Sequence, residues 1–338
     1  MGGIAVKPHH PSRRFLVWWV LLGLFLLAVS LDLSVGSVSI PLKEIVTILL
    51  GGDPEVETWR AIVLTFRLPK AITAIVAGAA LSVAGLQMQT LFGNPLAGPF
   101  VLGISSGASL GVALVVLVGS AGSWERMLSA SGGAAVVLGL VVLTAQRVRN
   151  RETLLLLGLM FGYAANAIVT ILLHFSSSEQ MQSYITWTFG SFGGVTWDRM
   201  TPFVVTVCLG LLVAYLLAKP LNLLLLGETS ARTLGLRMRW LQFWTITSAA
   251  VLAGSVTAFC GPIAFLGVAV PHLSRALLKT SDTRHLLLAV TVLGATLALY
   301  SDWVAQLPGR QVVLPLNAVT AALGTPVVTH AILQRHRR

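Results

Sequence analysis

Charged residues are scarce in this chain: they make up 10% of its 338 residues, whereas 55% of the residues are hydrophobic. Soluble domains carry roughly 25% charged residues. The mean hydropathy of this chain is +0.84, and no polar stretch in it is long enough to fold alone. From Ala71 to Trp124 the sequence contains no Asp, Glu, Lys or Arg. Because a membrane-spanning helix needs about 20 apolar residues, this run holds two spans, and we predict an all-α polytopic membrane protein.

The chain also lacks the residue patterns that metal centres and common enzymes need. Its two cysteines, Cys208 and Cys260, lie in apolar runs, so neither a disulfide framework nor a metal cluster is indicated. The sequence has no Gly-Lys pair for a phosphate-binding loop and no HExxH motif. We therefore expect no catalytic residue, no metal site and no cofactor bound by this chain.

Apolar runs of span length recur from Phe15 to the end of the chain. The first run looks like a signal peptide, but no clear small-x-small cleavage site follows it, so we interpret it as a span. We expect about ten transmembrane helices in one membrane domain, 15–334, between a tail at 1–14 and a basic tail at 335–338. The predicted spans cover about 15–31, 71–91, 99–119, 130–146, 153–173, 201–218, 241–259, 262–274, 285–301 and 312–333.

Lys and Arg are distributed unevenly between the two faces of a ten-span protein. Suppose that both termini, the turn at 93–99 and the loops at 147–152, 219–239 and 275–284 share one face. That face then holds 16 of the 23 Lys and Arg but 3 of the 12 acids. The positive-inside rule makes this face, with both termini, cytoplasmic, whereas a nine-span topology would put the arginine-rich C-terminus outside. The asymmetry also explains the net charge of +11, so nucleic acid is not an expected partner.

The segment from Gly93 to Pro99 interrupts the uncharged run. It contains two prolines and two glycines, which cannot continue a helix. Non-helical backbone near membrane depth is tolerated where it is buried in protein or lines a cavity. We therefore interpret the segment as part of a pathway wall or gate; the alternative is a tight turn without a further role.

The inner loop at 219–239 holds a second candidate site. Residues Gly227 to Gly235 have the pattern of a short amphipathic helix, which Thr229 or Ser230 would cap and Gly235 would end. Such a helix suits docking in a groove on a partner protein. The alternative is a helix that lies on lipid headgroups.

Almost no ionisable group falls in the middle of a predicted span. A proton- or sodium-coupled carrier usually has an acid there, so the absence indicates that energy enters from outside the spans. His272, in the eighth span, is either a ligand or proton relay or a residue packed against a neighbouring carbonyl.

Six motifs in a fixed order link the chain to a known family. They are Arg67-Leu-Pro-Lys70, Gly93-Asn-Pro-Leu-Ala97, Leu102-Gly-Ile-Ser-Ser-Gly107, Phe192-Gly-Gly-Val-Thr-Trp197, Leu226-Gly-Glu-Thr-Ser-Ala-Arg-Thr-Leu-Gly235 and Val270-Pro-His-Leu-Ser-Arg275. With them, the chain closely resembles, from about residue 15 to its end, the FecCD-type permease subunits of ATP-driven (ABC) importers for ferric siderophores, haem and cobalamin.

The resemblance implies the permease fold of these importers in the inner or plasma membrane of a prokaryote. It implies a homodimer, or a pair of similar permeases, that works with two cytoplasmic ATPase subunits and an extracytoplasmic substrate-binding protein. ATP and Mg would bind to the ATPase subunits, so this chain would be a pathway subunit and not an enzyme. Transport would follow alternating access.

The resemblance also assigns three sets of site residues. Coupling helices within about 219–239 would seat on the ATPase and correspond here to Gly227, Glu228, Thr229, Ser230, Ala231, Arg232, Leu234 and Gly235. The cytoplasmic gate corresponds to Asn94, Pro95 and Leu96 and, as a weaker match, to Glu152 and Thr153. Docking of the binding protein corresponds to Arg67 and Lys70, with Arg310 as a further candidate.

Two departures from the family pattern leave questions open. Members often carry an arginine shortly after the Ala-Asp of the ninth span, but here Asp302 is followed by Gln306, and Arg310 comes four residues later. Whether Arg310 substitutes for that arginine is open. In the last span, Asn317 either adds a polar group to the pathway or bonds within the bundle.

We predict the permease subunit of an ABC importer for a metal chelate, with a ferric siderophore as the first choice and haem or cobalamin as the others. The rival hypothesis is an autonomous secondary carrier for an apolar solute, which would use intramembrane polar groups such as Gln87, Asn166 and Asn317. An enzyme of lipid chemistry ranks third because no acid–base cluster is present.

Overall fold

The computed structural model describes residues 11–119, 122–148, 151–306 and 313–336, and within these ranges the chain is helical, without a strand. The all-α polytopic fold is confirmed. Short π- and 3-10-helical stretches occupy Ile62–Arg67, Pro99–Leu102 and Phe192–Gly194. The α-helices are α1 (Pro11–Ser34), α2 (Leu42–Leu49), α3 (Glu57–Ala61), α4 (Leu68–Phe92), α5 (Ile104–Val116), α6 (Ser123–Arg147), α7 (Arg151–His174), α8 (Ser178–Thr188), α9 (Trp197–Leu216), α10 (Ala218–Leu224), α11 (Glu228–Thr233), α12 (Met238–Cys260), α13 (Leu266–Leu278), α14 (Thr283–Gln306) and α15 (Leu316–His336).

Each predicted span coincides with one helix, but some predicted ends are wrong. In the described part of the chain, seven helical segments are long and apolar enough to cross a membrane, while α5, α13 and the apolar part of α15 are shorter. The second span begins earlier than predicted, because the helix runs without a break from Glu57 to Phe92. The third and eighth begin later, at Ile104 and Leu266, because irregular backbone precedes α5 and α13.

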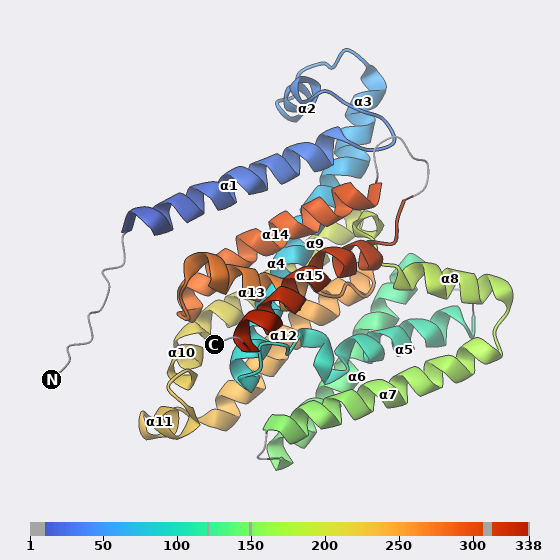
Figure 1. Cartoon of the computed structure of the whole chain (residues 1–338). Helices are drawn as coiled ribbons and strands as arrows, with labels where there is room; N and C mark the ends of the chain where they lie inside the picture. The colour runs from blue at the N-terminus through green and yellow to red at the C-terminus, as the bar shows by residue number, and fades with distance from the viewer. Residues whose placement is uncertain (1–10, 120–121, 149–150, 307–312, 337–338) are drawn as a thin grey trace.

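Helix α4 lies at the centre of the bundle, where it contacts α9, α12, α13 and α14 (Figure 1). Its closest contacts are at glycines. A Cβ at Gly85 would lie 1.7 Å from the carbonyl oxygen of Gly267 on α13, and a Cβ at Gly78 would lie 2.3 Å from that of Gly294 on α14. Because lipid gives membrane helices no hydrophobic drive to associate, such close backbone packing at small residues holds them together.

The remaining helices form a succession of contacts on either side of α4. On one side α12 contacts α6, α6 contacts α5, and α5 contacts α7; on the other side α14 contacts α1. The pair α5 and α6 also meets at small residues, since a Cβ at Gly111 would lie 1.9 Å from the carbonyl oxygen of Ser129. The bundle is thus a series of helix layers around one largely buried helix.

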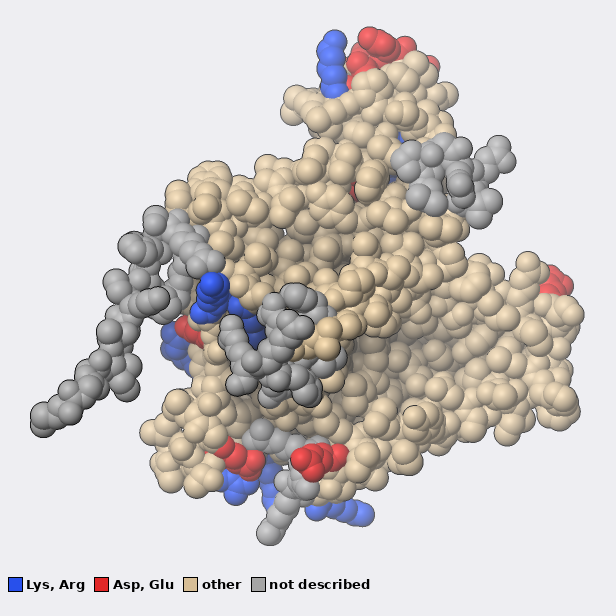
Figure 2. Space-filling view, in the orientation of Figure 1, with Lys and Arg blue, Asp and Glu red and all other residues tan. Residues whose placement is uncertain are grey.

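The two ends of the bundle carry different elements. Helices α2, α3 and α8 lie at one end in Figure 1, while α10, α11, the end of α6 and the start of α7 lie at the other. Figure 2 shows the visible Lys, Arg, Asp and Glu near these ends, with a broad uncharged band between them. This band matches the layer that a bilayer would cover. Residues 219–239, which the charge distribution assigns to the cytoplasm, lie at the end with α11.

The glycine contact between α4 and α13 gives a first prediction. We expect Gly85→Ala to lower the midpoint of thermal unfolding in detergent, because its Cβ must displace backbone, and overpacking costs about 1–3 kcal/mol. Gly139→Ala on α6 is the control, since nothing lies within 4 Å of its Cβ position. Equal midpoints for the two variants would show that the α4–α13 contact relaxes freely.

Candidate functional site

The short helix predicted in the inner loop is present as α11, and its C-terminal end is the one expected. Gly235 has a φ of 86°, in the left-handed region. The backbone N–H of Leu236 donates to the carbonyl of Ala231, and the N–H of Gly235 donates to that of Arg232, both at 3.0 Å. These two bonds make a Schellman motif, which fixes where the chain turns from α11 toward α12.

The predicted N-terminal cap of α11 is wrong. The helix begins at Glu228, and the capping position is Gly227, with a φ of 94° and no side-chain hydrogen bond. Thr229 and Ser230 therefore lie inside the first turn rather than before it. Position 227 favours glycine, because residues with a side chain rarely adopt a φ of 94°.

Helix α11 presents one buried side and one exposed side. Ala231 is completely buried. Leu226, before the first residue of the helix, and Leu234, after its last, are 62% and 60% exposed. Arg232 and Glu228 form an exposed ion pair at 2.6 Å, one turn apart. Exposed leucines on a polar end of a membrane protein indicate a surface that another molecule covers.

Helix α10 connects α11 to the bundle. It packs against α4 and α14, and the Nδ2 of Asn222 donates to Oδ1 of Asp282 at 2.6 Å, just before α14. The Oδ1 of Asn222 accepts from the backbone N–H of Thr283 at 2.7 Å. A displacement of α11 would therefore reach α14 through a specific pair of side chains.

The hydrogen bond from Asn222 holds the pKa of Asp282 below its ordinary value, with the backbone N–H of Arg284 and the nearby His285 acting in the same direction. A carboxyl group with a lowered pKa in the folded protein adds stability above its unfolded pKa and loses it as the pH falls through the folded pKa. The link between α10 and α14 is thus intact at neutral pH and weakens only in acid.

The turn that follows α4 is half exposed and half buried. Gly93, with a φ of 62°, ends α4, and Oδ1 of Asn94 accepts from the backbone N–H of Leu96 at 2.9 Å. Asn94 and Leu96 are exposed and Pro95 is partly buried, whereas Ala97 and the residues up to Pro99 are buried. The turn therefore projects a short exposed tip from a segment wedged into the bundle, and its role in a gate stays a prediction.

The second part of the predicted gate lies on an element that packs against the same segment. Glu152 and Thr153 are exposed in the first turn of α7. One turn further along, a Cβ at Gly158 would lie 2.8 Å from the Cα of Leu102, in the 3-10 turn that follows the tip. The structure thus brings the two gate elements together, while the gating role of their residues stays a prediction.

A buried polar cluster lies at the opposite end of α4. We call Asp32, Arg67, Lys70, Asp302 and Gln306 the outer polar cluster. Lys70 Nζ lies 2.7 Å from Oδ2 of Asp302, with side chains 19% and 9% exposed. Nε2 of Gln306 donates to the same oxygen at 2.8 Å and to Oδ1 of Asp32 at 3.3 Å. The cluster joins α1, α4 and α14.

Arg67 and Lys70, the predicted docking residues, have partners within the subunit. Arg67 is 6% exposed and donates to the backbone carbonyls of Leu33 and Val38, and Lys70 is committed to Asp302. Both side chains hold the subunit together, so neither is free to face acids on a partner in this conformation. Their docking role stays a prediction without a surface to support it, and Arg310 lies outside the described residues.

Two members of the outer polar cluster were not singled out from the sequence. Asp32 follows the predicted end of the first span, yet it lies in the last turn of α1 and is 1% exposed. Gln306 was noted only as a replacement for arginine. The signal that could have found them is an acid and an amide at the ends of two spans, together with Lys70, the lone charged residue at the start of a third.

The polar residues that the rival carrier hypothesis requires are mostly used within the bundle. Gln87 on α4 is completely buried and exchanges hydrogen bonds with Ser248 on α12 at 3.1 and 3.2 Å. Oδ1 of Asn317 accepts from the backbone N–H of Ala264 at 3.1 Å, which answers the open question about Asn317 in favour of bonding within the bundle. Asn166 is exposed on α7.

Comparison with known proteins agrees with this geometry. The model of the FecCD transport family matches residues 24–334. This chain belongs to the FecCD transport family. Vitamin B12 import system permease proteins named BtuC, from Salmonella paratyphi A and Salmonella typhimurium, are 34% identical to it over 335 residues, which is 96% of this chain and 98% of each relative.

Two solved structures have the same fold as this FecCD member. A protein described as a metal-chelate type ABC transporter, in an inward-facing conformation, superposes with a TM-score of 0.85 at 27% identity over 96% of this chain and all of the other. PsaBC from Streptococcus pneumoniae, at 15% identity and a TM-score of 0.56 over 86% of this chain and 95% of that one, shares the fold alone.

The outer polar cluster gives a second prediction. We expect Asp302→Ala to lower the free energy of unfolding by on the order of 3 kcal/mol, because it leaves the largely buried Lys70 without its partner. The control is Asp53→Ala, which breaks an ion pair of similar length with Arg60, 2.8 Å, whose Asp53 side chain is 99% exposed; exposed pairs contribute little. Thermal unfolding in detergent measures both variants. If both midpoints fell by a similar small amount, the cluster would have no special structural role.

Proposed function

We propose that this chain is the membrane-spanning permease subunit of an ABC importer that moves a metal chelate from a binding protein into the cytoplasm. Family membership over residues 24–334 supports the class. The observation that carries the proposal is α11: a short helix with a fixed C-terminal turn and exposed leucines, held on the end of the bundle by α10. Such a helix suits a groove on a separate protein.

The partners follow from the same class. Two ATPase subunits would bind ATP and Mg and receive Gly227–Gly235, so this chain performs no hydrolysis. A second copy of the permease would complete the pathway, and a binding protein would deliver the cargo at the end with α2 and α3. Both termini would lie in the cytoplasm of a prokaryote, in line with the excess of Lys and Arg in the segments at the end with α11.

ATP hydrolysis on the partner would displace α11, and this displacement would be transmitted to α10. From there the Asn222–Asp282 bond leads to α14 and the packing of α10 leads to α4. Helix α4 ends at the exposed tip that holds Asn94 and Leu96. Movement at α11 can therefore open and close the cytoplasmic gate, which is what alternating access requires.

The cargo belongs to the class of bulky metal chelates. Ferric siderophores and haem are the family's other cargoes, but the B12 permeases that match over the full chain support cobalamin as the first cargo to test. The secondary-carrier hypothesis is not favoured, because Gln87 and Asn317 have hydrogen-bond partners inside the bundle and a polar pathway would need them free.

Replacement of an exposed leucine on the loop of α11 tests the proposal. We expect Leu234→Asp to abolish ATP-dependent uptake of cobalamin or another chelate into proteoliposomes, because a charge on the docking surface disfavours seating in an apolar groove. The ATPase should no longer co-purify, while the thermal midpoint stays that of the parent. Leu50→Asp, at the opposite end and 83% exposed, is the control and should retain the ATPase.

Two results would contradict the proposal. Uptake without ATP or partners would favour the secondary carrier. Normal ATPase binding by the Leu234→Asp variant would show that α11 is not the docking element, and the alternative of a helix lying on lipid headgroups would then hold.

A further inference from the structure

We propose that the inner end of α6 and α12 binds an anionic phospholipid, with its headgroup near Arg237 and Arg239 and an acyl chain along the seam between the two helices. The inference does not depend on the cargo or on the ATPase. It rests on a charged hollow, an apolar seam that continues from it, and aromatic side chains at the boundary between the two.

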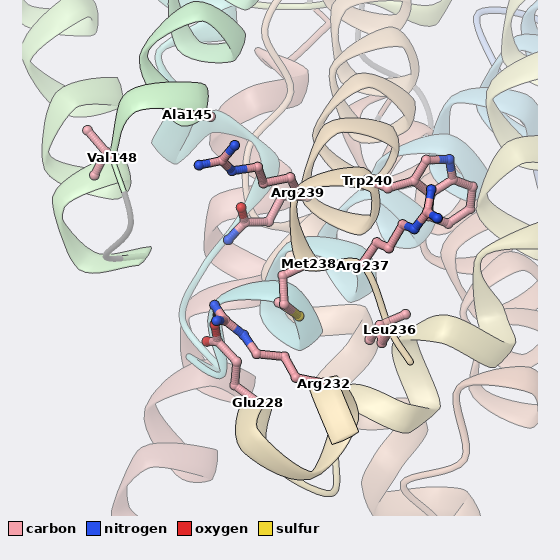
Figure 3. A pocket seen from close by; sticks show the side chains of 10 residues that line it. Ala145, Val148, Glu228, Arg232, Leu236, Arg237, Met238, Arg239 and Trp240 are labelled. Atoms are coloured by element: carbon pink, nitrogen blue, oxygen red, sulfur yellow. Dashed lines mark hydrogen bonds and ion pairs between the residues drawn. The ribbon is translucent and has the colours of Figure 1, made fainter. Parts of the chain in front are cut away.

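The charged hollow has a volume of about 710 Å³ and lies between the end of α6, α11 and the start of α12. Figure 3 shows Arg239 reaching toward the end of α6, Arg232 beside Glu228, and Arg237 on the side of Trp240. The residues that line it are Ala145, Val148, Glu228, Arg232, Leu236, Arg237, Met238, Arg239, Trp240 and Gln242.

The charge of this hollow favours an anion. It contains three arginines and one acid, Glu228, which is paired with Arg232 at 2.6 Å. In the described ranges, Arg237 and Arg239 are exposed and form no ion pair. They also lie at the N-terminus of the 23-residue helix α12, where the helix dipole adds a positive partial charge. Basic pockets between helices on the cytoplasmic side are suited to phospholipid headgroups.

The hollow continues into an apolar seam between α6 and α12. A small second hollow shares Ala145, Arg239 and Gln242 with the first and is closed by Val142, Phe243 and Ile246. One helical turn further along both helices lies a third hollow of about 310 Å³, open to the surface. It is lined by Ser131, Ala134, Ala135, Leu138, Thr206, Ala250, Val251, Gly254 and Ser255. Small side chains on both helices thus leave space along this seam in which an acyl chain could pack.

Aromatic residues mark the level at which headgroup and chain would meet. Trp240, Phe243 and Trp244, in the first two turns of α12, are each more than a third exposed. Trp is enriched at the membrane–water boundary, where its ring lies at the level of the headgroups. Arg239 lines both the charged hollow and the start of the seam, as a side chain does when its stem packs on apolar surface and its head stays in a polar layer.

The apolar seam beside the arginines favours a lipid over the other anionic occupants. A free phosphate would use the arginines but leave the apolar hollows without a function. An ATPase seated on α11 would cover the end of the bundle, whereas the third hollow is lined by residues from the middle of α6, α9 and α12. Only an amphipathic molecule fills both parts.

The test uses the chain in nanodiscs of phosphatidylcholine that contain a low fraction of photoactivatable phosphatidylglycerol, with the reactive group on the acyl chain. We expect labelling at 131–148 and 237–246, mapped by mass spectrometry. Arg237→Gln with Arg239→Gln should reduce this labelling by about tenfold, from the loss of two basic contacts. A photoactivatable phosphatidylcholine should label the same peptides weakly and equally in both proteins.

The control variant is Lys219→Gln with Arg284→Gln, which removes the same charge from exposed residues at the same end, outside the hollow. It should retain full labelling. Ala135→Phe, which fills the third hollow from an exposed position, should reduce labelling within 131–138 while the thermal midpoint is unchanged. Equal labelling by the two lipids, an unaffected arginine variant, or loss of labelling when the ATPase is bound would each overturn the proposal.

Discussion

Close backbone contact along α4 is the constraint on which the rest of the structure depends. At Gly78 and Gly85 this helix approaches the carbonyl groups of α14 and α13 so closely that no side chain fits. The same helix carries Lys70 at one end and the Asn94–Leu96 tip at the other. Any movement of α4 between its neighbours therefore changes both faces of the protein together, as a pathway that opens alternately requires.

The polar groups inside the bundle serve its assembly. Arg67, Lys70, Gln87 and Asp302 all have partners on other segments, and each partner lies far away in the sequence. An unpaired polar group in such surroundings would be costly, so these bonds specify which helices meet. They also leave few groups to couple transport to protons or ions, which agrees with an energy source outside the spans.

The sequence predicted what depends on local composition and missed what depends on distant partners. Apolar runs located every span, and Gly235 located the end of α11, because a left-handed turn favours glycine. The starts of α5 and α13 were wrong because a 3-10 turn precedes α5 and a non-helical stretch that ends at Phe265, with a φ of 69°, precedes α13. The burial of Arg67 was not predicted, because its acceptors are backbone carbonyls, which carry no sequence signal.

The inner end of the bundle presents two surfaces that meet at the link between α11 and α12. On one side of this link stand the exposed leucines of α11, and on the other lie Arg237 and Arg239 beside the apolar seam. The bond from Leu236 to Ala231 ties the two surfaces to one backbone segment. A lipid that fixes the start of α12 would therefore also limit the positions of α11, so the membrane and the ATPase would act on the same hinge from opposite sides.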